Sequence, residues 1–365
     1  MPSIATSSPA DPGISVVVPV RNGARWLAEV IGAVARECAG RPHEILVVDD
    51  GSTDGSPAIC RALPVPHLRL LAGCGRGAAA AINLGIRQSA FPFVAQIDQD
   101  VIVLPGWLPA LLGAMDDTRL GAAQGWYATD RAAAPLARAM AMDLEQRYAR
   151  LPGGATDHVC TGNVLWRRQA VLDAGLLDET LGYGYDNDLS YRMTAAGFGL
   201  RICPGARSLH RWRDGLWSYL QQQYGFGYGR LDLVWRHRTR LCGDAVSPAP
   251  MMAHPLVMAV AVALLVAAGG AALAGGRPGP PAAASLALVV ALAAERAAAG
   301  VRALRQWRDP AALLFPPVHL LRDLAWVCAA ARWCVRRLAR RRPQPSHSMR
   351  ARAVDCRLPM PAEEP

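Results

Sequence analysis

Short apolar runs alternate with polar turns along the first hundred residues. Uninterrupted aliphatic and β-branched stretches, which are typical of buried strands, occupy 14–19, 44–48, 68–71 and 93–97. Between these stretches, apolar residues recur at the spacing of a helix face in 26–34, 57–62 and 78–88. Strands that alternate with helices across short turns predict an α/β domain with a mostly parallel sheet and helices on both faces.

The pattern changes after residue 105. Residues 106–150 are helical in character and carry no specific motif. Apolar positions from Leu189 onward mark one face of a helix that starts near Asp186. A further strand is predicted over 200–204.

Composition divides the chain into segments. Residues 1–13 and 343–365 are polar and rich in proline, and both are predicted to be disordered. The strands and helices between them predict one folded domain over 14–235. The first residues are not basic and then apolar, so no signal peptide is predicted and this domain is expected in the cytoplasm.

Two apolar runs without charge follow the folded region. Residues 255–274 hold no charged side chain, and ~20 such residues suffice to cross a bilayer. The second run, 281–294, is shorter and fits a buried helix as well as a membrane span. If 281–300 also crosses, the two runs form a transmembrane hairpin over 255–300. Otherwise 281–294 packs against the first span.

The stretch 311–340 is predicted to lie in the membrane interface rather than to cross it. Arg322 and Asp323 fall in the middle of this run, where a spanning helix would have to bury them in lipid. Trp326, Trp333 and an arginine-rich end are typical of an amphipathic helix at the lipid surface.

Charge supports a membrane location. The net charge is +10, and all 39 basic residues are arginines, which cluster at 236–240 and 332–342 beside the apolar runs. Such clusters face the cytoplasm and anionic lipid, so we expect the chain in the inner (cell) membrane with its folded domain on the cytoplasmic face. Nucleic-acid binding would need interleaved aromatics and groove-reading motifs that are missing here. Nine scattered cysteines without a Cys-x-x-Cys pair favour reduced thiols over a zinc site or a disulfide framework.

The run at 93–97 ends on the most informative residues. Asp98 and Asp100 are two residues apart on an extended segment, so their carboxylates point the same way. Beyond the carboxyl end of a strand they would face the crevice in which open α/β sheets bind ligands. Hard divalent cations bind such oxygens together with a substrate's phosphates. Alone, this pattern is more often a loop, but acidic clusters at 49–50 and 186–188 favour a site.

Other polar turns allow structural as well as functional explanations. The doublet at 49–50 either caps the next helix or contacts a ligand. The glycine-rich turn 73–77 is either a phosphate-binding loop or, more commonly, a tight turn. Asp186 and Asp188 lie at a helix N-terminus, where the dipole stabilises a carboxylate and keeps it ionised, as a general base must be. A single histidine is usually structural, but His210 comes where a predicted strand ends.

Six motifs occur in one order between residues 15 and 230. They are Ser15-Val-Val-Val-Pro-Val-Arg-Asn22, Val47-Val-Asp-Asp-Gly-Ser-Thr-Asp-Gly55, Ala81-Ile-Asn83-Leu-Gly85, Asp98-Gln-Asp100, Asp186-Asn-Asp-Leu-Ser-Tyr-Arg192 and Pro204-Gly-Ala-Arg-Ser-Leu-His210. In this order they resemble the family 2 glycosyltransferases, which are inverting enzymes that use a nucleotide-activated sugar. The resemblance implies a GT-A (Rossmann-like) fold, followed here by C-terminal membrane helices.

The resemblance also implies a role for each matched position. Asp186 would be the catalytic base, and Asp100 and His210 would bind Mn²⁺ or Mg²⁺. The substrate-binding residues would be Pro19, Asn22, Asp50, Asn83, Asp98, Asp188 and Arg192. Chemistry agrees with these roles, because a cation that neutralises the nucleoside diphosphate removes the need for a protein acid on that side. One ionised carboxylate on the opposite face then takes the acceptor's proton, and the displacement inverts the anomeric centre.

Three positions depart from the family pattern. Tyr185 stands where a Glu usually precedes the catalytic Asp, and Ile82 stands where an Arg commonly precedes the Asn. The Gln-x-x-Arg-Trp motif of processive polysaccharide synthases is absent, which favours transfer of a single sugar. The run of glycines and aromatics at 221–230 takes its place. This run is either an acceptor loop or, as we favour, an irregular linker to the membrane part.

The sequence therefore predicts a membrane-anchored glycosyltransferase that moves one sugar from a nucleotide donor to a lipid-linked or membrane-delivered hydroxyl. The resemblance extends to the glycosyltransferases of mycofactocin maturation, so a peptide-derived redox cofactor is an alternative acceptor. A non-catalytic nucleotide-sugar-binding scaffold is a second hypothesis, with Tyr185 as a sign of decay; the retained acidic residues oppose it. A nucleotidyltransferase would release pyrophosphate instead, and its glycine-rich basic signature is not found in 14–25.

Overall fold

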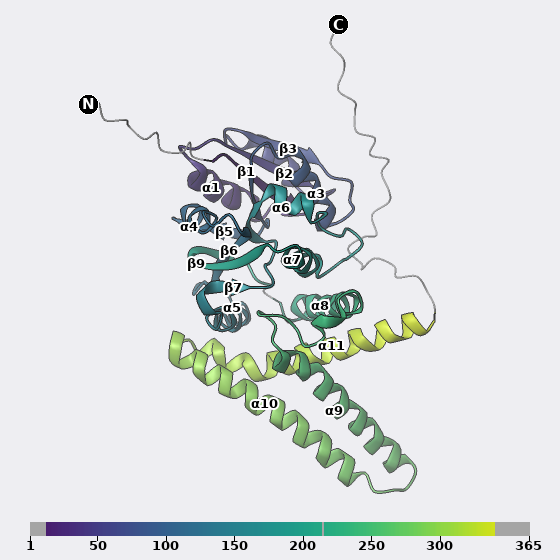
Figure 1. Ribbon diagram of the computed structural model, residues 1–365. Coiled ribbons are helices and arrows are strands. Elements are labelled where there is room, and N and C mark those ends of the chain that lie inside the picture. Colours follow the sequence, from purple (N-terminus) through teal and green to yellow (C-terminus); the bar gives the residue numbers. More distant parts are fainter. Residues whose placement is uncertain (1–11, 214, 340–365) are drawn as a thin grey trace, which may run out of the picture.

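The computed structural model describes residues 12–213 and 215–339. Within these ranges, a sheet carries helices on both faces, and long helices extend from one end of the domain (Figure 1). The strands are β1 (Ile14–Val20), β2 (His43–Asp49), β3 (Leu68–Ala72), β4 (Phe93–Ile97), β5 (Val101–Val103), β6 (Leu120–Ala128), β7 (Ala155–Thr156), β8 (Asn163–Arg167) and β9 (Gly199–His210). The helices are α1 (Leu27–Cys38), α2 (Ser56–Ala62), α3 (Ala78–Gln88), α4 (Trp107–Ala114), α5 (Pro135–Tyr148), α6 (Arg168–Asp173), α7 (Tyr185–Ala195), α8 (Leu216–Arg236), α9 (Ala249–Leu273), α10 (Gly279–Trp307) and α11 (Phe315–Leu338).

The sheet is mixed rather than mostly parallel. Its strand order is β3-β2-β1-β4-β8-β6-β9-β5, with β7 beside β9. The first four strands are parallel, as expected of strands joined by helical crossovers. Beyond β4 the direction alternates: β8 is antiparallel to β4 and β6, and β9 is parallel to β6 but antiparallel to β5. The α/β class is confirmed, and the parallel arrangement holds for the N-terminal half.

The predicted helical region 106–150 contains a strand, so this part of the prediction was wrong. β6 has a sequence of small residues with little intrinsic strand preference, and its neighbours β8 and β9 hold it in the sheet. A larger side chain would not fit at Gly125 of this strand, because a Cβ there would lie 2.3 Å from Asn163 Oδ1. β9 also continues six residues past Pro204, to His210.

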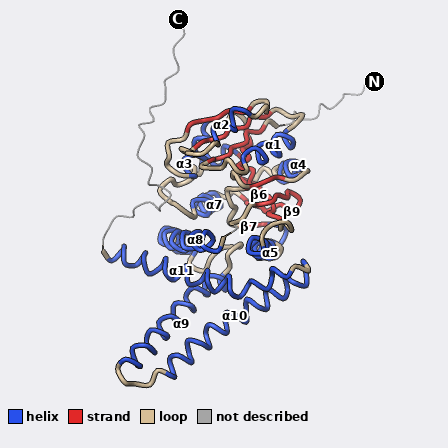
Figure 2. The backbone as a smooth tube through the Cα atoms, turned by 180° about the vertical axis from the view of Figure 1, so that it is seen from behind, coloured by secondary structure: helices blue, strands red, loops and turns tan. Residues whose placement is uncertain are grey.

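Two hydrophobic cores lie on opposite faces of the sheet. Helices cover both of these faces (Figure 2). On one face, α1 and α4 pack on the strands, with Trp107 and Leu27 fully buried. On the other face, α3, α6 and α7 supply residues such as Ile82 and Leu189. Because both faces are covered, the ends of the strands are the part of the sheet left free to bind a ligand.

The glycine–aromatic run 221–230 is helical, so the prediction of an irregular linker was wrong. It forms the middle of α8, and its glycines lie where other elements pass closely. A Cβ on Gly229 would lie 2.6 Å from Tyr183 Cβ, and one on Gly227 would lie 3.0 Å from Trp326 Cα. Tertiary packing therefore outweighs the poor helix propensity of glycine here.

Gly229→Ala should destabilise the protein although it improves helix propensity. The added methyl meets Tyr183 Cβ and, at 2.9 Å, the Tyr183 carbonyl oxygen, which cannot turn aside as a flexible side chain could. Overpacking of this kind costs about 1–3 kcal/mol, and thermal unfolding in detergent measures it. Gly113→Ala, in helix α4 with nothing within 4 Å, is the matched control and should keep or slightly raise the melting temperature. Equal effects of the two changes would contradict the packing argument.

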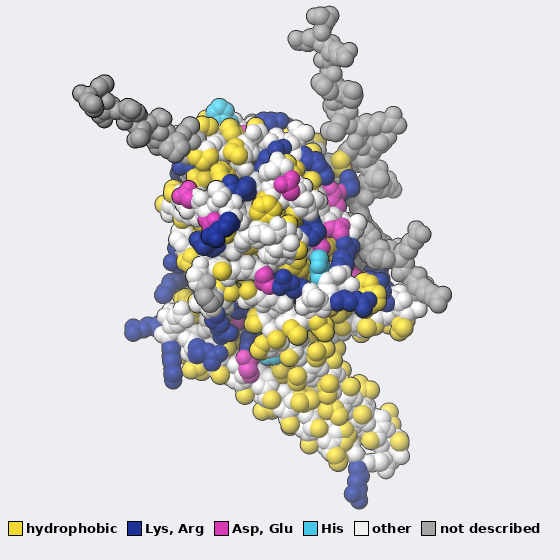
Figure 3. All heavy atoms as spheres, viewed as in Figure 1, with side chains coloured by type: hydrophobic (Ala, Val, Ile, Leu, Met, Phe, Trp, Pro, Cys, Tyr) yellow, Lys and Arg dark blue, Asp and Glu magenta, His cyan; other side chains and the backbone are white. Residues whose placement is uncertain are grey.

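Three helical segments are long and apolar enough to cross a membrane, judged by length and composition: Ala249–Leu273, Gly279–Trp307 and Pro310–Leu338. The first two pack together as a hairpin that extends away from the domain. Figure 3 shows hydrophobic side chains over nearly the whole visible face of this hairpin, and basic side chains beside its base. That the hairpin crosses a bilayer stays a prediction. The predictions for 1–11 and 343–365 lie outside the described residues.

Helix α11 is docked on the domain instead of standing free. It lies along α8, and the Arg322 and Asp323 side chains are 5% and 1% exposed and paired with each other at 2.8 Å. Because protein encloses these charges, they do not argue against a span as the sequence suggested. The interfacial location of 311–340 therefore stays a prediction. The same segment is also long and apolar enough to be a candidate membrane span.

A third, small core joins the domain to the C-terminal helices α10 and α11. Ala139 and Met142 of α5 pack against Ala299 and Ala303 of α10 and against Phe315. Beside it, the Asp143 carboxylate of α5 faces Arg147 of α5, Arg296 of α10 and His319 of α11. The pKa of Asp143 falls to about 2, because burial, which alone would raise it, is outweighed by His319, Arg147, Arg322 and Arg296. Helix α5 thus links the sheet to these C-terminal helices.

Candidate active site

The turns after β1 and β2 are tied together by predicted site residues. Asn22 has a positive φ of 55°, and its side-chain oxygen accepts a hydrogen bond from the Thr53 N–H at 2.7 Å. Asp50 accepts from the backbone N–H groups of Arg76 and Gly77, at 3.0 and 2.8 Å. The glycine turn 73–77 therefore donates to a protein carboxylate, which fits the tight-turn explanation. Pro19 is buried in β1 beside Val48.

Three further predicted residues belong to supporting networks. Asn83 is 1% exposed and exchanges hydrogen bonds with the backbone of Leu177 at 2.9 and 3.0 Å. Asp188 accepts from Arg192 at 2.7 Å and contacts His237 Nε2 at 2.8 Å. Arg192 also donates to the carbonyl oxygen of Leu176. These contacts hold α3 and α7 in place, and none of the three residues lines the cavity described below.

The double aspartate and the histidine come together as predicted. β5 pairs with β9 so that Val101 lies opposite His210, which brings His210 Nε2 to 3.4 Å from Asp100 Oδ1. Burial alone would raise the pKa of Asp100, but His210 and Arg213 hold it below its usual range. Asp98 Oδ1 accepts from Gln96 at 2.9 Å. Burial, together with the like charge of Asp100, raises the pKa of Asp98 to about 7.

Asp186 stands across from this cluster, in the first turn of α7. Gly184, at a φ of 79°, precedes the helix, and Asp186 Oδ1 accepts from the Asn187 N–H at 2.9 Å. Burial is the largest cause of the raised pKa of the Tyr185 phenol. This neighbour of Asp186 is therefore neutral, whereas a Glu at the same position would carry a charge. His158 Nε2 lies 3.8 Å from Asp186 Oδ2. His158 was not predicted, because it is a single histidine outside any sequence motif.

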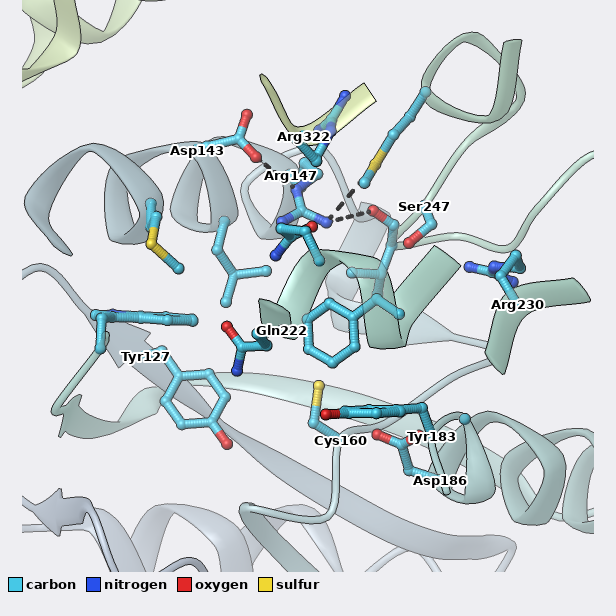
Figure 4. A pocket seen from close by; sticks show the side chains of 18 of the residues that line it. Tyr127, Asp143, Arg147, Cys160, Tyr183, Asp186, Gln222, Arg230, Ser247 and Arg322 are labelled. Atoms are coloured by element: carbon cyan, nitrogen blue, oxygen red, sulfur yellow. Dashed lines mark hydrogen bonds and ion pairs between the residues drawn. The ribbon is translucent and has the colours of Figure 1, made fainter. Parts of the chain in front are cut away.

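A cavity of about 420 Å³ lies between these residues and helices α8 and α11. Asp98, Asp186 and His210 line it on the side of the sheet, while α8 and α11 contribute Phe226 and Trp326 on the other. Figure 4 shows Asp186 and Cys160 at one end and Asp143, Arg147 and Arg322 at the other. The cavity is thus walled by both the sheet and the C-terminal helices α8 and α11.

Two sets of side chains could hold a metal. Asp98, Asp100 and His210 offer carboxylate oxygens and one imidazole, a hard set that suits Mn²⁺ or Mg²⁺. The donor atoms of His158, Cys160 and Asp186 also lie within 4.8 Å of one another. Cysteine binds metals as the thiolate, and burial raises the pKa of Cys160 to about 12. This second set is therefore poorly suited to a hard cation.

Comparison with known proteins now agrees with the geometry. Residues 15–174 match the glycosyl transferase family 2 profile. The chain carries a family 2 glycosyltransferase domain. It is 31% identical over 272 residues to the pre-mycofactocin glycosyltransferase of Mycobacterium tuberculosis (strain ATCC 25618 / H37Rv). The aligned region covers 71% of this chain and 55% of that protein. It is 30% identical over 222 residues to the succinoglycan biosynthesis protein ExoO of Rhizobium meliloti (strain 1021), covering 56% of this chain and 62% of that protein.

The fold of the glycosyltransferase domain and its helices is also similar to a solved structure. A mannosyltransferase from Pyrobaculum calidifontis, determined in complex with GDP-Man and Mn²⁺, superposes with a TM-score of 0.56 at 17% identity. The match covers 89% of this chain and 90% of that one. At this identity the likeness shows the fold, and the GT-A architecture expected from the motifs is confirmed. The chain spans little more than half the length of the curated relatives.

Proposed function

We propose that this protein is an inverting glycosyltransferase that moves one sugar from a nucleoside-diphosphate sugar to a hydroxyl acceptor delivered at the membrane. The observation that carries this proposal is the cavity between Asp98 and Asp186 of the domain and helices α8 and α11. An acceptor that reaches the site along these helices would arrive beside the base. The domain would lie on the cytoplasmic face of the inner membrane.

The residues of the chain divide the chemistry between two sides of the cavity. Asp98, Asp100 and His210 would hold Mn²⁺ or Mg²⁺, which when bound supplies positive charge to the departing nucleoside diphosphate. Asp186 would take the acceptor's proton as the acceptor oxygen bonds to the anomeric carbon and the bond from that carbon to the diphosphate breaks. Attack from the face opposite the leaving group inverts the anomeric centre.

Two acceptor classes fit this cavity. A lipid-linked hydroxyl would reach it from the anchor. A peptide-derived redox cofactor is the second candidate, favoured by the identity to the pre-mycofactocin glycosyltransferase. The scaffold hypothesis is disfavoured, because Asp98, Asp186 and His210 all line one cavity and Asp100 lies beside His210.

A donor screen tests the proposed function. We expect the detergent-solubilised chain to release nucleoside diphosphate from one nucleotide sugar, with Mn²⁺ or Mg²⁺ present, and faster when a lipid-linked or peptide-derived hydroxyl acceptor is added. Release requires cleavage of the bond between the sugar and the diphosphate, whereas a scaffold would bind the donor without turnover. Release of pyrophosphate from a nucleoside triphosphate would instead establish a nucleotidyltransferase.

A further inference from the structure

A buried imidazole lies between two carboxylates at the back of the cavity. His158, in the segment between β7 and β8, is 7% exposed. Its Nε2 lies 3.8 Å from Asp186 Oδ2, and its Nδ1 lies 4.0 Å from Asp244 Oδ1. Neither ring nitrogen has a hydrogen-bond partner among the described residues. Buried polar atoms are usually partnered, so two orphaned nitrogens that both face carboxylates need an explanation.

Asp244 is a fixed support for this ring. Its fully buried side chain accepts hydrogen bonds from Tyr191 at 2.9 Å, Arg230 at 3.1 Å and Asn187 at 3.2 Å. The backbone N–H of Ser247 donates to the other oxygen, Asp244 Oδ1, at 2.7 Å. Asp244 therefore cannot move without breaking a network. The Asp186 carboxylate, by contrast, accepts one hydrogen bond from a backbone N–H and faces the His158 ring.

Only the protonated ring satisfies both neighbours. A neutral imidazole donates from one nitrogen and presents a lone pair at the other, which would face a carboxylate here, whereas an imidazolium donates from both. Burial disfavours the charged ring, but the neighbouring carboxylates of Asp186 and Asp244 outweigh burial and Arg230, so the pKa of His158 is raised. The remaining titratable neighbour, Cys160, is a neutral thiol.

We propose that protonated His158, supported by Asp244, holds the Asp186 carboxylate in the orientation that receives the acceptor's proton. His158 is a positioning residue in this scheme: it keeps its own proton while Asp186 accepts one and the diphosphate leaves. It supplies the charged neighbour that Tyr185, as a neutral phenol, does not. The inference rests on the proposed function, since Asp186 must be the base.

His158→Gln should lower kcat about 10- to 100-fold, the loss typical when a group that orients a functional side chain is removed, with the KM for the donor unchanged. The pH profile carries the decisive signal. Imidazolium is present below the raised pKa of His158 and is lost as pH rises through it, so wild-type kcat should fall on the alkaline side. Glutamine has no such titration, and the variant should lose this fall. His67→Asn, at an exposed histidine that is not among the residues lining the cavity, is the control and should behave as wild type.

A uniform drop in kcat with an unchanged alkaline fall would show that His158 is merely structural and would overturn the inference. A second measurement does not depend on folding of a His158 variant. In ¹³C-labelled histidine spectra, the pKa of His158 should fall in Asp186→Asn, because coupling between the two groups is reciprocal. An unchanged His158 titration would equally overturn the inference. If Asp186→Asn still transfers sugar, the base assignment itself fails, which is a different outcome.

Discussion

Replacing Asp186 with asparagine should reduce sugar transfer by a factor of about 10² to 10⁴, the usual contribution of a general base, while donor affinity stays near the wild-type value. Asparagine keeps the shape of the side chain and can still accept from the Asn187 N–H, but it cannot take a proton. The donor's diphosphate would bind on the other side of the cavity, near Asp98 and His210. Nucleoside diphosphate release and donor titration by calorimetry separate the two effects.

Asp173→Asn is the matched control, because Asp173 is exposed at the end of α6 and is not among the residues that line the cavity. It should transfer sugar at the wild-type rate. Equal losses of transfer and donor affinity in Asp186→Asn would remove the base assignment and place this carboxylate in the donor site.

The regular N-terminal half of the fold was predictable from local pattern. β1 to β4, α2 and α3 lie within one or two residues of their predicted bounds, because each strand is a buried apolar run and each helix has one apolar face. Helix α1 continues four residues past its predicted end, to Cys38. β6 and α8 were not predictable. Their sequences are rich in small residues, and contacts with distant segments, such as Asn163 against Gly125 and Tyr183 against Gly229, decide their conformation.

The same division applies to the candidate site. Asp98, Asp186 and His210 follow motifs, and the structure brings them to one cavity. Asn83, Asp188 and Arg192 also belong to motifs, yet their side chains bond to the protein's own backbone and neighbours. A motif therefore marks a residue as constrained without saying whether it meets the substrate or supports one that does. His158 and Asp244 had no motif, because their role depends on a contact between segments 86 residues apart.

Asp100→Ala should weaken Mn²⁺-dependent donor binding by about tenfold or more, because a divalent cation of this type is held by few protein carboxylates and the loss of one is not replaced. Titration of donor binding with Mn²⁺ measures the effect. Asp116→Ala, at an exposed aspartate after α4, is the control and should leave the titration unchanged. An unchanged Mn²⁺ titration in Asp100→Ala would remove Asp100 from the metal site.

The pH dependence of this titration distinguishes a lost ligand from a general disturbance. Asp98 must be deprotonated to bind a cation, and its pKa is raised to about 7 by burial and by the charge of Asp100. Mn²⁺ affinity of the wild type should therefore fall as pH drops through about 7. In Asp100→Ala the like charge is gone, so the pKa of Asp98 falls and the affinity, although weaker, should begin to decline only at a lower pH. A decline at the same pH in both proteins would mean that Asp98 and Asp100 do not share the cation.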